Sequence, residues 1–122
     1  YLAKLISFDI DGTLEVGDPP GAITMDMVRK AQSAGFLIGS CSDRTISSQE
    51  RLWKEHGIVV AFTILKQKLA DLKTRFQAEE YYHIGDSEVD RYVSFQAGFH
   101  FLQPDDGVLQ LQSLDGNPQG PS

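Results

Sequence analysis

Short apolar runs alternate with longer amphipathic stretches along most of this 122-residue sequence. The apolar runs are rich in β-branched and aromatic residues, while apolar residues in the stretches between them recur at helical spacing. This alternation is typical of parallel strands joined by crossover helices. The runs are mostly continuous, which indicates that helices cover both faces of a central five-stranded parallel sheet. The expected strands are residues 5–8, 36–41, 58–62, 81–84 and 99–102.

Cap residues bound the expected helices. Thr24 is a good N-cap and Gly35 can take the left-handed conformation that ends a helix, so the first helix should lie between them. Ser47 and Glu50 have the spacing of a capping box, which predicts a second helix that begins there and ends at Gly57. The third and fourth helices should face the core with Leu65, Leu69, Leu72 and Phe76, and with Val89, Val93 and Ala97.

Length and composition limit the domain organisation. With 41% hydrophobic residues, a chain of this length can bury one core. We therefore expect one α/β domain, three-layered and Rossmann-like, over residues 1–103. After residue 103 the composition shifts to Gln, Asp, Gly, Pro and Ser, which predicts a loosely ordered tail over residues 104–122. The chain begins with Tyr1 rather than Met, so it can be a piece of a longer protein.

Charge and cysteine content exclude several classes of partner. The 17 acidic and 11 basic residues give a net charge of -6, which disfavours nucleic acid as a partner. The single cysteine, Cys41, excludes an intrachain disulfide framework and a thiolate metal cage, and we expect it to be buried in a strand. Neither a long apolar segment nor a basic leader is present, so we expect no membrane association and a cytoplasmic location.

Polar side chains follow the expected strands where the chain leaves the sheet. They are Asp9 and Asp11 after the first strand, Ser42, Asp43 and Arg44 after the second, Lys66 and Lys68 after the third, and Asp86 and Asp90 after the fourth. Open parallel sheets bind ligands at the carboxyl ends of their strands. We expect these residues to form one site, with carboxylates for a hard cation and a hydroxyl and a lysine for phosphate oxygens.

The segment from Phe8 to Leu14, FDIDGTL, resembles the first motif of the haloacid-dehalogenase (HAD) phosphatase superfamily. Two aspartates in a turn are common, but DxDGT directly after an apolar strand is a specific pattern. Further matches follow in the order typical of the superfamily: Ser42 in SDR, a lysine at the start of the third helix, and GDSEVD over residues 85–90. The resemblance covers residues 4–102.

The resemblance implies a phosphohydrolase that works through an aspartyl-phosphate. Asp9 would be the nucleophile, and Asp11 would protonate the leaving oxygen and then activate water. Relatives that are not phosphatases often lack this second aspartate, so Asp11 points to phosphate-ester hydrolysis. The implied cofactor is Mg²⁺, held by Asp9, the backbone carbonyl of Asp11 and the side chain of Asp86, with Asp90 orienting these ligands. Asp90 can instead be a helix N-terminal charge stabilised by the helix dipole.

Ser42 and a lysine are the implied ligands of the phosphoryl oxygens. Lys66 has the more usual position at the start of the helix and is favoured, although Lys68, followed by Leu69, also matches relatives that lack a cap domain. Arg44 either holds substrate or pairs with an acidic neighbour, for which the sequence offers Asp43 and Glu50. His56, His83 and His100 have no mutual spacing that indicates a metal site, and we assign them core or surface roles.

No cap domain is expected, because only residues 15–23 and one helix separate the first two motifs. Relatives built in this way take bulky substrates into an open site or use a neighbouring subunit as a lid, so a homo-oligomer is one expectation. Residues 17–21, GDPPG, form either a flap or an ordinary surface turn.

These features predict a Mg²⁺-dependent phosphohydrolase that cleaves a phosphomonoester whose identity the sequence does not give. One alternative is a catalytically idle HAD-like domain that binds phosphate or metal. Another is a phosphoacceptor receiver domain. The acceptor aspartate of receiver domains usually follows the third strand, whereas the motif here follows the first.

Overall fold

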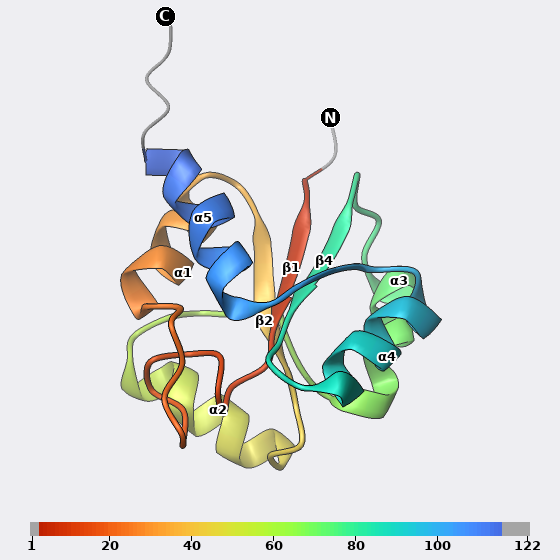
Figure 1. The fold of residues 1–122 in the computed structure, drawn as a ribbon, viewed down its shortest axis with the longest axis horizontal. Helices are drawn as coiled ribbons and strands as arrows, with labels where there is room; N and C mark the ends of the chain where they lie inside the picture. Colours follow the sequence, from red (N-terminus) through yellow and green to blue (C-terminus); the bar gives the residue numbers. More distant parts are fainter. Residues whose placement is uncertain (1–2, 116–122) are drawn as a thin grey trace, which may run out of the picture.

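All five strands of the sheet are parallel in the computed structural model, which describes residues 3–115 (Figure 1). The strands are β1 (Leu5–Phe8), β2 (Leu37–Ser42), β3 (Phe62–Leu65), β4 (Tyr81–Ile84) and β5 (His100–Leu102). Their order in the sheet is β3-β2-β1-β4-β5. The chain thus builds outward from β1 to β3 and then crosses to the other side of β1. This change of direction, between β1 and β4, is where open α/β sheets bind ligands.

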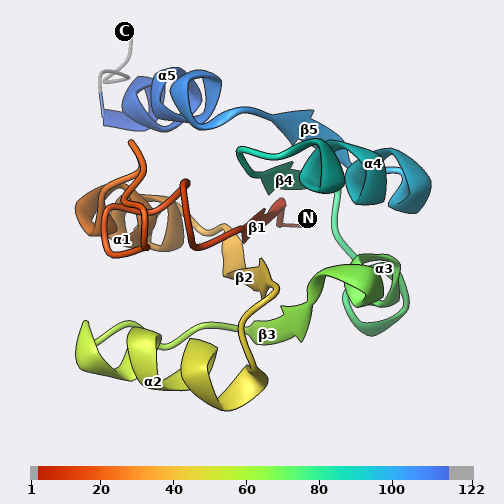
Figure 2. The ribbon, with the colours of Figure 1, turned by 60° about the horizontal axis from the view of Figure 1, so that its bottom comes forward.

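Helices cover both faces of the sheet (Figure 2). On one face lie α1 (Met25–Ser33), α2 (Ile46–Glu55) and α5 (Pro104–Asp115). On the other lie the 3₁₀ helix η1 (Lys66–Asp71), the short α3 (Leu72–Arg75) and α4 (Glu88–Ala97). The expected α/β architecture with a five-stranded parallel sheet between helical layers is confirmed.

Each face of the sheet has its own apolar core because side chains alternate along a strand. In β1, Ile6 and Phe8 belong to the core beneath α1, α2 and α5, and Leu5 belongs to the core beneath η1, α3 and α4. Two polar side chains interrupt this second core. Ser7 and His83 are fully buried and lie opposite each other in the register of β1 and β4.

The strand predictions are right for four strands and wrong for one. β1 and β4 have the expected bounds, and β2 and β5 each begin one residue later than expected. The third strand is Phe62–Leu65 rather than residues 58–62, because β2 pairs its residues Gly39 to Ser42 with this segment. The more apolar residues before it form the connection from α2, where Ile58 is buried but Val59 is exposed.

The helices differ from the sequence predictions in three places, at two helix starts and on the face of α4. Thr45, not Ser47, caps α2, and its hydroxyl oxygen accepts from the backbone N–H of Ser48 at 3.2 Å. The third helical segment begins as a 3₁₀ helix, and Leu65 belongs to β3. Val89 on α4 is 54% exposed, because the buried stripe of this helix consists of Asp90, Ser94 and Ala97.

The helix α5 corrects the expectation of a loose tail for residues 104–115. Its residue Leu111 is buried, and Val108 and Leu114 pack against the same core as α1. The rest of the expected tail, residues 116–122, lies outside the described residues. Over residues 3–115, none of the helices combines the length and apolar character needed to cross a membrane.

Candidate functional site

The polar residues that follow the strands converge on one cavity at the carboxyl edge of the sheet. Its volume is about 330 Å³. The lining residues are Asp9, Asp11, Pro19, Ser42, Asp43, Lys66, Asp86, Ser87 and Val89. Apart from Pro19, which lies in the loop before α1, they come from the ends of β1, β2, β3 and β4 and from the start of α4. The cavity therefore lies at the point between β1 and β4 where the sheet topology predicts a ligand site.

Backbone geometry after β1 places the two aspartates of the first motif. The backbone N–H of Ile10 donates to Asp9 Oδ1 at 2.8 Å, which fixes the Asp9 carboxylate at the strand end. Gly12 has a φ of 78°, a conformation that favours glycine. A Cβ atom at Gly12 would lie 2.0 Å from Asp86 Oδ2. Glycine is thus required both for the turn and for the approach of Asp86 to Asp9.

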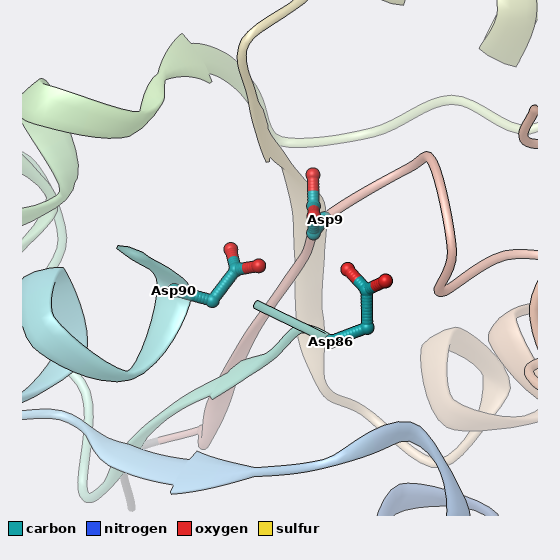
Figure 3. Close-up of side chains that lie close together, drawn as sticks. All are labelled: Asp9, Asp86 and Asp90. Atoms are coloured by element: carbon teal, nitrogen blue, oxygen red, sulfur yellow. The ribbon is translucent and has the colours of Figure 1, made fainter. Parts of the chain in front are cut away.

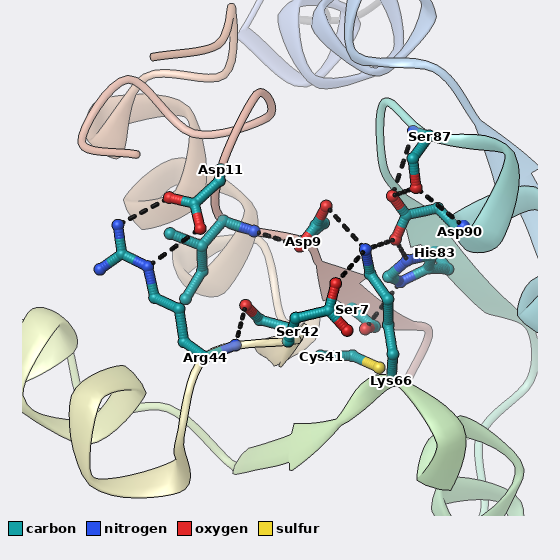
Figure 4. A network of polar contacts seen from close by, with 12 residues as sticks. Ser7, Asp9, Asp11, Cys41, Ser42, Arg44, Lys66, His83, Ser87 and Asp90 are labelled. Carbon is teal, nitrogen blue, oxygen red and sulfur yellow. Dashed lines mark hydrogen bonds and ion pairs between the residues drawn. The ribbon is translucent and has the colours of Figure 1, made fainter. Parts of the chain in front are cut away.

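Three acidic side chains surround the ammonium group of Lys66 (Figure 4). Lys66 Nζ lies 3.3 Å from Asp9 Oδ2, 3.3 Å from Asp90 Oδ1 and 3.5 Å from Asp43 Oδ2. Burial disfavours the charged lysine, but the charges of Asp9 and Asp90 outweigh burial and raise the pKa of Lys66 above its ordinary value. Lys68 is exposed and does not line the cavity.

Asp90 is a fully buried carboxylate with a donor on each oxygen. His83 Nε2 lies 2.8 Å from Asp90 Oδ1, and Ser87 donates to Oδ2 from its hydroxyl at 2.7 Å and from its backbone N–H at 3.2 Å. Ser87 is also the N-cap of α4, so a capping box holds Asp90 at the helix start. Burial opposes ionisation, but the bonds from His83 and Ser87 hold the pKa of Asp90 well below its ordinary value.

Asp9 differs from Asp90 because its surroundings raise its pKa rather than lower it. Its burial and the neighbouring charge of Asp90 raise the pKa of Asp9 to about 7, although the Lys66 ammonium opposes this rise. Asp9 and Asp90, the two buried carboxylates beside Lys66, share this single ammonium group, which leaves an excess of negative charge in a buried place. The arrangement therefore favours a proton or a further cation near Asp9.

Asp9, Asp86 and Asp90 form a group in which one carboxylate oxygen from each residue lies within 4.8 Å of the other two (Figure 3). Asp86 is exposed, whereas the other two are buried. Carboxylate oxygens are the ligands that Mg²⁺ prefers, and Mg²⁺ keeps waters on its open side. The residues present fit this ion, and the Gly12 backbone leaves the space that Asp86 needs to join the group.

Asp11 is joined to Arg44 by two hydrogen bonds (Figure 4). Arg44 Nη2 donates to Asp11 Oδ1 at 2.6 Å and Nε donates to Oδ2 at 3.2 Å. The bonds from Arg44, supported by the backbone N–H of Asp18, hold the pKa of Asp11 below its ordinary value. Arg44 thus pairs with an acidic residue that the sequence reasoning did not consider, rather than with Asp43 or Glu50.

Ser42 is buried at the end of β2, and its hydroxyl oxygen accepts from the backbone N–H of Arg44 at 3.0 Å.

Residues 17–21, the expected flap or surface turn, contact the first motif. The backbone N–H of Asp18 donates to Asp11 Oδ1, and the backbone N–H of Gly12 donates to the carbonyl oxygen of Pro19 at 2.6 Å. Of residues 17–21, Pro19 lines the cavity near Asp11.

The sequence reasoning missed the buried partners of Asp90. His83 was assigned a general core or surface role, yet it lies between Ser7 and Asp90, with His83 Nδ1 2.9 Å from Ser7 Oγ. The sequence held a signal for this contact. Ser7 and His83 are polar residues within apolar strands, and a motif aspartate follows shortly after each strand. Ser87, the N-cap residue within GDSEVD, carried a second signal.

The sequence matches no protein-family model and no curated protein closely enough to count as a relative. What the chain does is therefore inferred from its motifs and from the geometry of this cavity.

Proposed function

We propose that this chain is a Mg²⁺-dependent phosphohydrolase of the HAD type that cleaves a phosphomonoester through an aspartyl-phosphate on Asp9. The observation that carries the proposal is the buried Asp9 carboxylate at the switch point of the sheet, with Lys66 Nζ 3.3 Å away and Ser42 in the same cavity. A nucleophile, a fixed cation and a hydroxyl are the groups that phosphoryl transfer needs. The FDIDGTL motif and the later motif matches support the same class.

In the first step an Asp9 oxygen attacks phosphorus, the bond from phosphorus to the leaving oxygen breaks, and Asp11 gives that oxygen a proton. In the second step water attacks phosphorus, Asp11 takes the proton of the water, and the bond from phosphorus to Asp9 breaks to release inorganic phosphate. Each displacement is easier than direct hydrolysis because the enzyme supplies the nucleophile and the proton in place. Lys66 and Ser42 would bind phosphoryl oxygens.

Asp9, Asp86, Asp90 and the backbone carbonyl of Asp11 would hold Mg²⁺. When bound, the ion would offset the charge of the carboxylates and of the phosphate group, which keeps Asp9 ionised. The proposal includes a site without a cap domain. The described residues between the first two motifs form the loop of residues 15–23, α1 and β2.

One observation favours the alternative of a domain that binds phosphate and metal without turnover. Asp11, the proposed acid and base, is held by both hydrogen bonds from Arg44. Catalysis requires Arg44 to release Asp11 when substrate enters, and an anionic substrate gives Arg44 a competing partner.

A generic aryl phosphate separates these two functions. We expect release of phosphate with Mg²⁺, no release with a chelator, and none from the Asp9→Asn variant. Asp43→Asn is the matched control, since Asp43 lines the same cavity and contacts Lys66 but has an 81% exposed side chain. Turnover that survives in Asp9→Asn, or the absence of metal-dependent turnover in the wild type, would exclude the proposed function.

A further inference from the structure

A chain of three buried polar side chains runs beneath the candidate site, from the sheet to α4. Ser7 Oγ lies 2.9 Å from His83 Nδ1, and His83 Nε2 lies 2.8 Å from Asp90 Oδ1. All three residues are fully buried. Ser7 and His83 face each other in the register of β1 and β4, so the sheet backbone fixes their separation. Neither Ser7 nor His83 reaches the cavity.

The partners of His83 define which ring nitrogen carries the proton. An ionised Asp90 can only accept, so His83 Nε2 must donate to it. In the neutral ring Nδ1 then has a lone pair, which accepts the hydroxyl proton of Ser7. A serine hydroxyl can donate or accept, so the carboxylate of Asp90 sets the tautomer. Ser7 holds the ring in place from its other nitrogen.

Asp90 passes this restraint to the site. Its Oδ1 also contacts Lys66 Nζ at 3.3 Å, and Lys66 Nζ contacts Asp9 Oδ2 at the same distance. Ser87 holds Oδ2, so His83 and Ser87 together prevent rotation of the carboxylate. An apolar side chain at position 83 would still fill the core, but it would leave Asp90 Oδ1 without its closest donor.

We propose that His83, held in place by Ser7, is a positioning residue that sets the orientation of Asp90 and thereby the Mg²⁺ affinity of the Asp9, Asp86 and Asp90 group. It also fixes the place of Lys66 beside Asp9. The proposal rests on the proposed function for the identity of the ion. Partners that orient ligand side chains of a metal site typically change metal affinity or activity about 10- to 100-fold when they are removed.

The test is calorimetric titration of the full chain with MgCl₂. We expect His83→Leu to weaken Mg²⁺ binding about 10- to 100-fold. His83→Gln should restore most of the affinity, because its side-chain amide can donate to Asp90. Ser7→Ala should weaken binding in the same direction by a smaller factor, because the ring keeps its bond to Asp90 and loses only the partner of its other nitrogen.

The matched control is Ser94→Ala. Ser94 is fully buried and its hydroxyl donates to the backbone carbonyl of Asp90 at 2.7 Å, so the variant loses a buried hydrogen bond but keeps every contact of the carboxylate. It should bind Mg²⁺ as the wild type does. A purely structural role for His83 would lower the unfolding temperature of His83→Leu without changing the Mg²⁺ affinity of the folded protein.

Equal Mg²⁺ affinities of folded His83→Leu and wild type would overturn the proposal. If His83→Leu does not fold, an unchanged affinity of Ser7→Ala overturns it in the same way. Failure of the wild type to bind Mg²⁺ is a different result, because it removes the metal from the proposed function and this inference with it.

Discussion

Asp9→Asn should make the metal-free protein more stable at neutral and alkaline pH. The substitution keeps the shape of the side chain but removes a charge that the folded state tolerates poorly. Burial and Asp90 raise the pKa of Asp9 from its ordinary 3.8 to about 7, a value that already includes the attraction of Lys66. The side chain is only 6% exposed, so solvent screens this cost little.

The magnitude follows from the change in pKa. Each pKa unit corresponds to about 1.4 kcal/mol, so the ionised carboxylate costs the fold up to about 4 kcal/mol. The folded chain holds the Asp9 proton more tightly than the unfolded chain, and the wild type therefore loses stability as pH rises from 3.8 to about 7. The gain in the free energy of unfolding of Asp9→Asn over wild type should be absent near pH 3. It should increase between pH 3.8 and about 7 and stay constant at higher pH.

The assay is urea denaturation with a chelator at pH 5 and pH 8, comparing Asp9→Asn with wild type. Asp43→Asn is the control and should change stability by less than about 0.5 kcal/mol, because it alters an exposed charge beside the same lysine. Asp9→Asn that is no more stable than wild type at pH 8 would refute the reasoning. It would mean that Lys66 fully compensates the buried charge.

Three further predictions follow from the site. Lys66→Met should lower kcat for an aryl phosphate by about 10²-fold or more, whereas Lys68→Met should leave it unchanged; equal losses would contradict the placement of Lys66. Arg44→Met should raise the pKa of Asp11 and extend kcat to higher pH, because Asp11 must be protonated to act as the acid, and an unmoved alkaline limb would argue against this role. MgCl₂ at about 100 times its Kd should raise the free energy of unfolding by about 2.7 kcal/mol, and Gly12→Ala should abolish that gain; a melting temperature that does not respond to Mg²⁺ would exclude the metal site.

The sequence was sufficient where a local pattern decides the structure. β1 and β4 are apolar runs that end at a motif, so their bounds could be read directly. β3 could not be placed in this way, since its position depends on pairing with β2 rather than on its own apolar content. α5 was missed because its polar composition hides an apolar stripe of Val108, Leu111 and Leu114, which matters only once α1 lies beside it.

The site residues also divide into those that a local sequence pattern predicts and those that depend on contacts between distant segments. Strand ends predicted that Asp9, Ser42 and Asp86 would meet at one cavity, since parallel strands share a carboxyl edge. Partners from distant segments could not be predicted, because they depend on which strands are neighbours. The pair of Asp11 with Arg44 and the contact of His83 with Asp90 are of this kind.

The central claim is a covalent phosphoryl group on Asp9, and acid quenching followed by peptide mass mapping tests it most directly. The Asp11→Asn variant with an aryl phosphate is the best sample. The aryl leaving group needs little protonation, so the first step proceeds while hydrolysis of the intermediate is slow. We predict that the peptide containing Asp9 gains the mass of one phosphoryl group in the presence of Mg²⁺, and that Asp9→Asn gains none. Turnover by the wild type without phosphorylation of Asp9 in this variant would contradict the account.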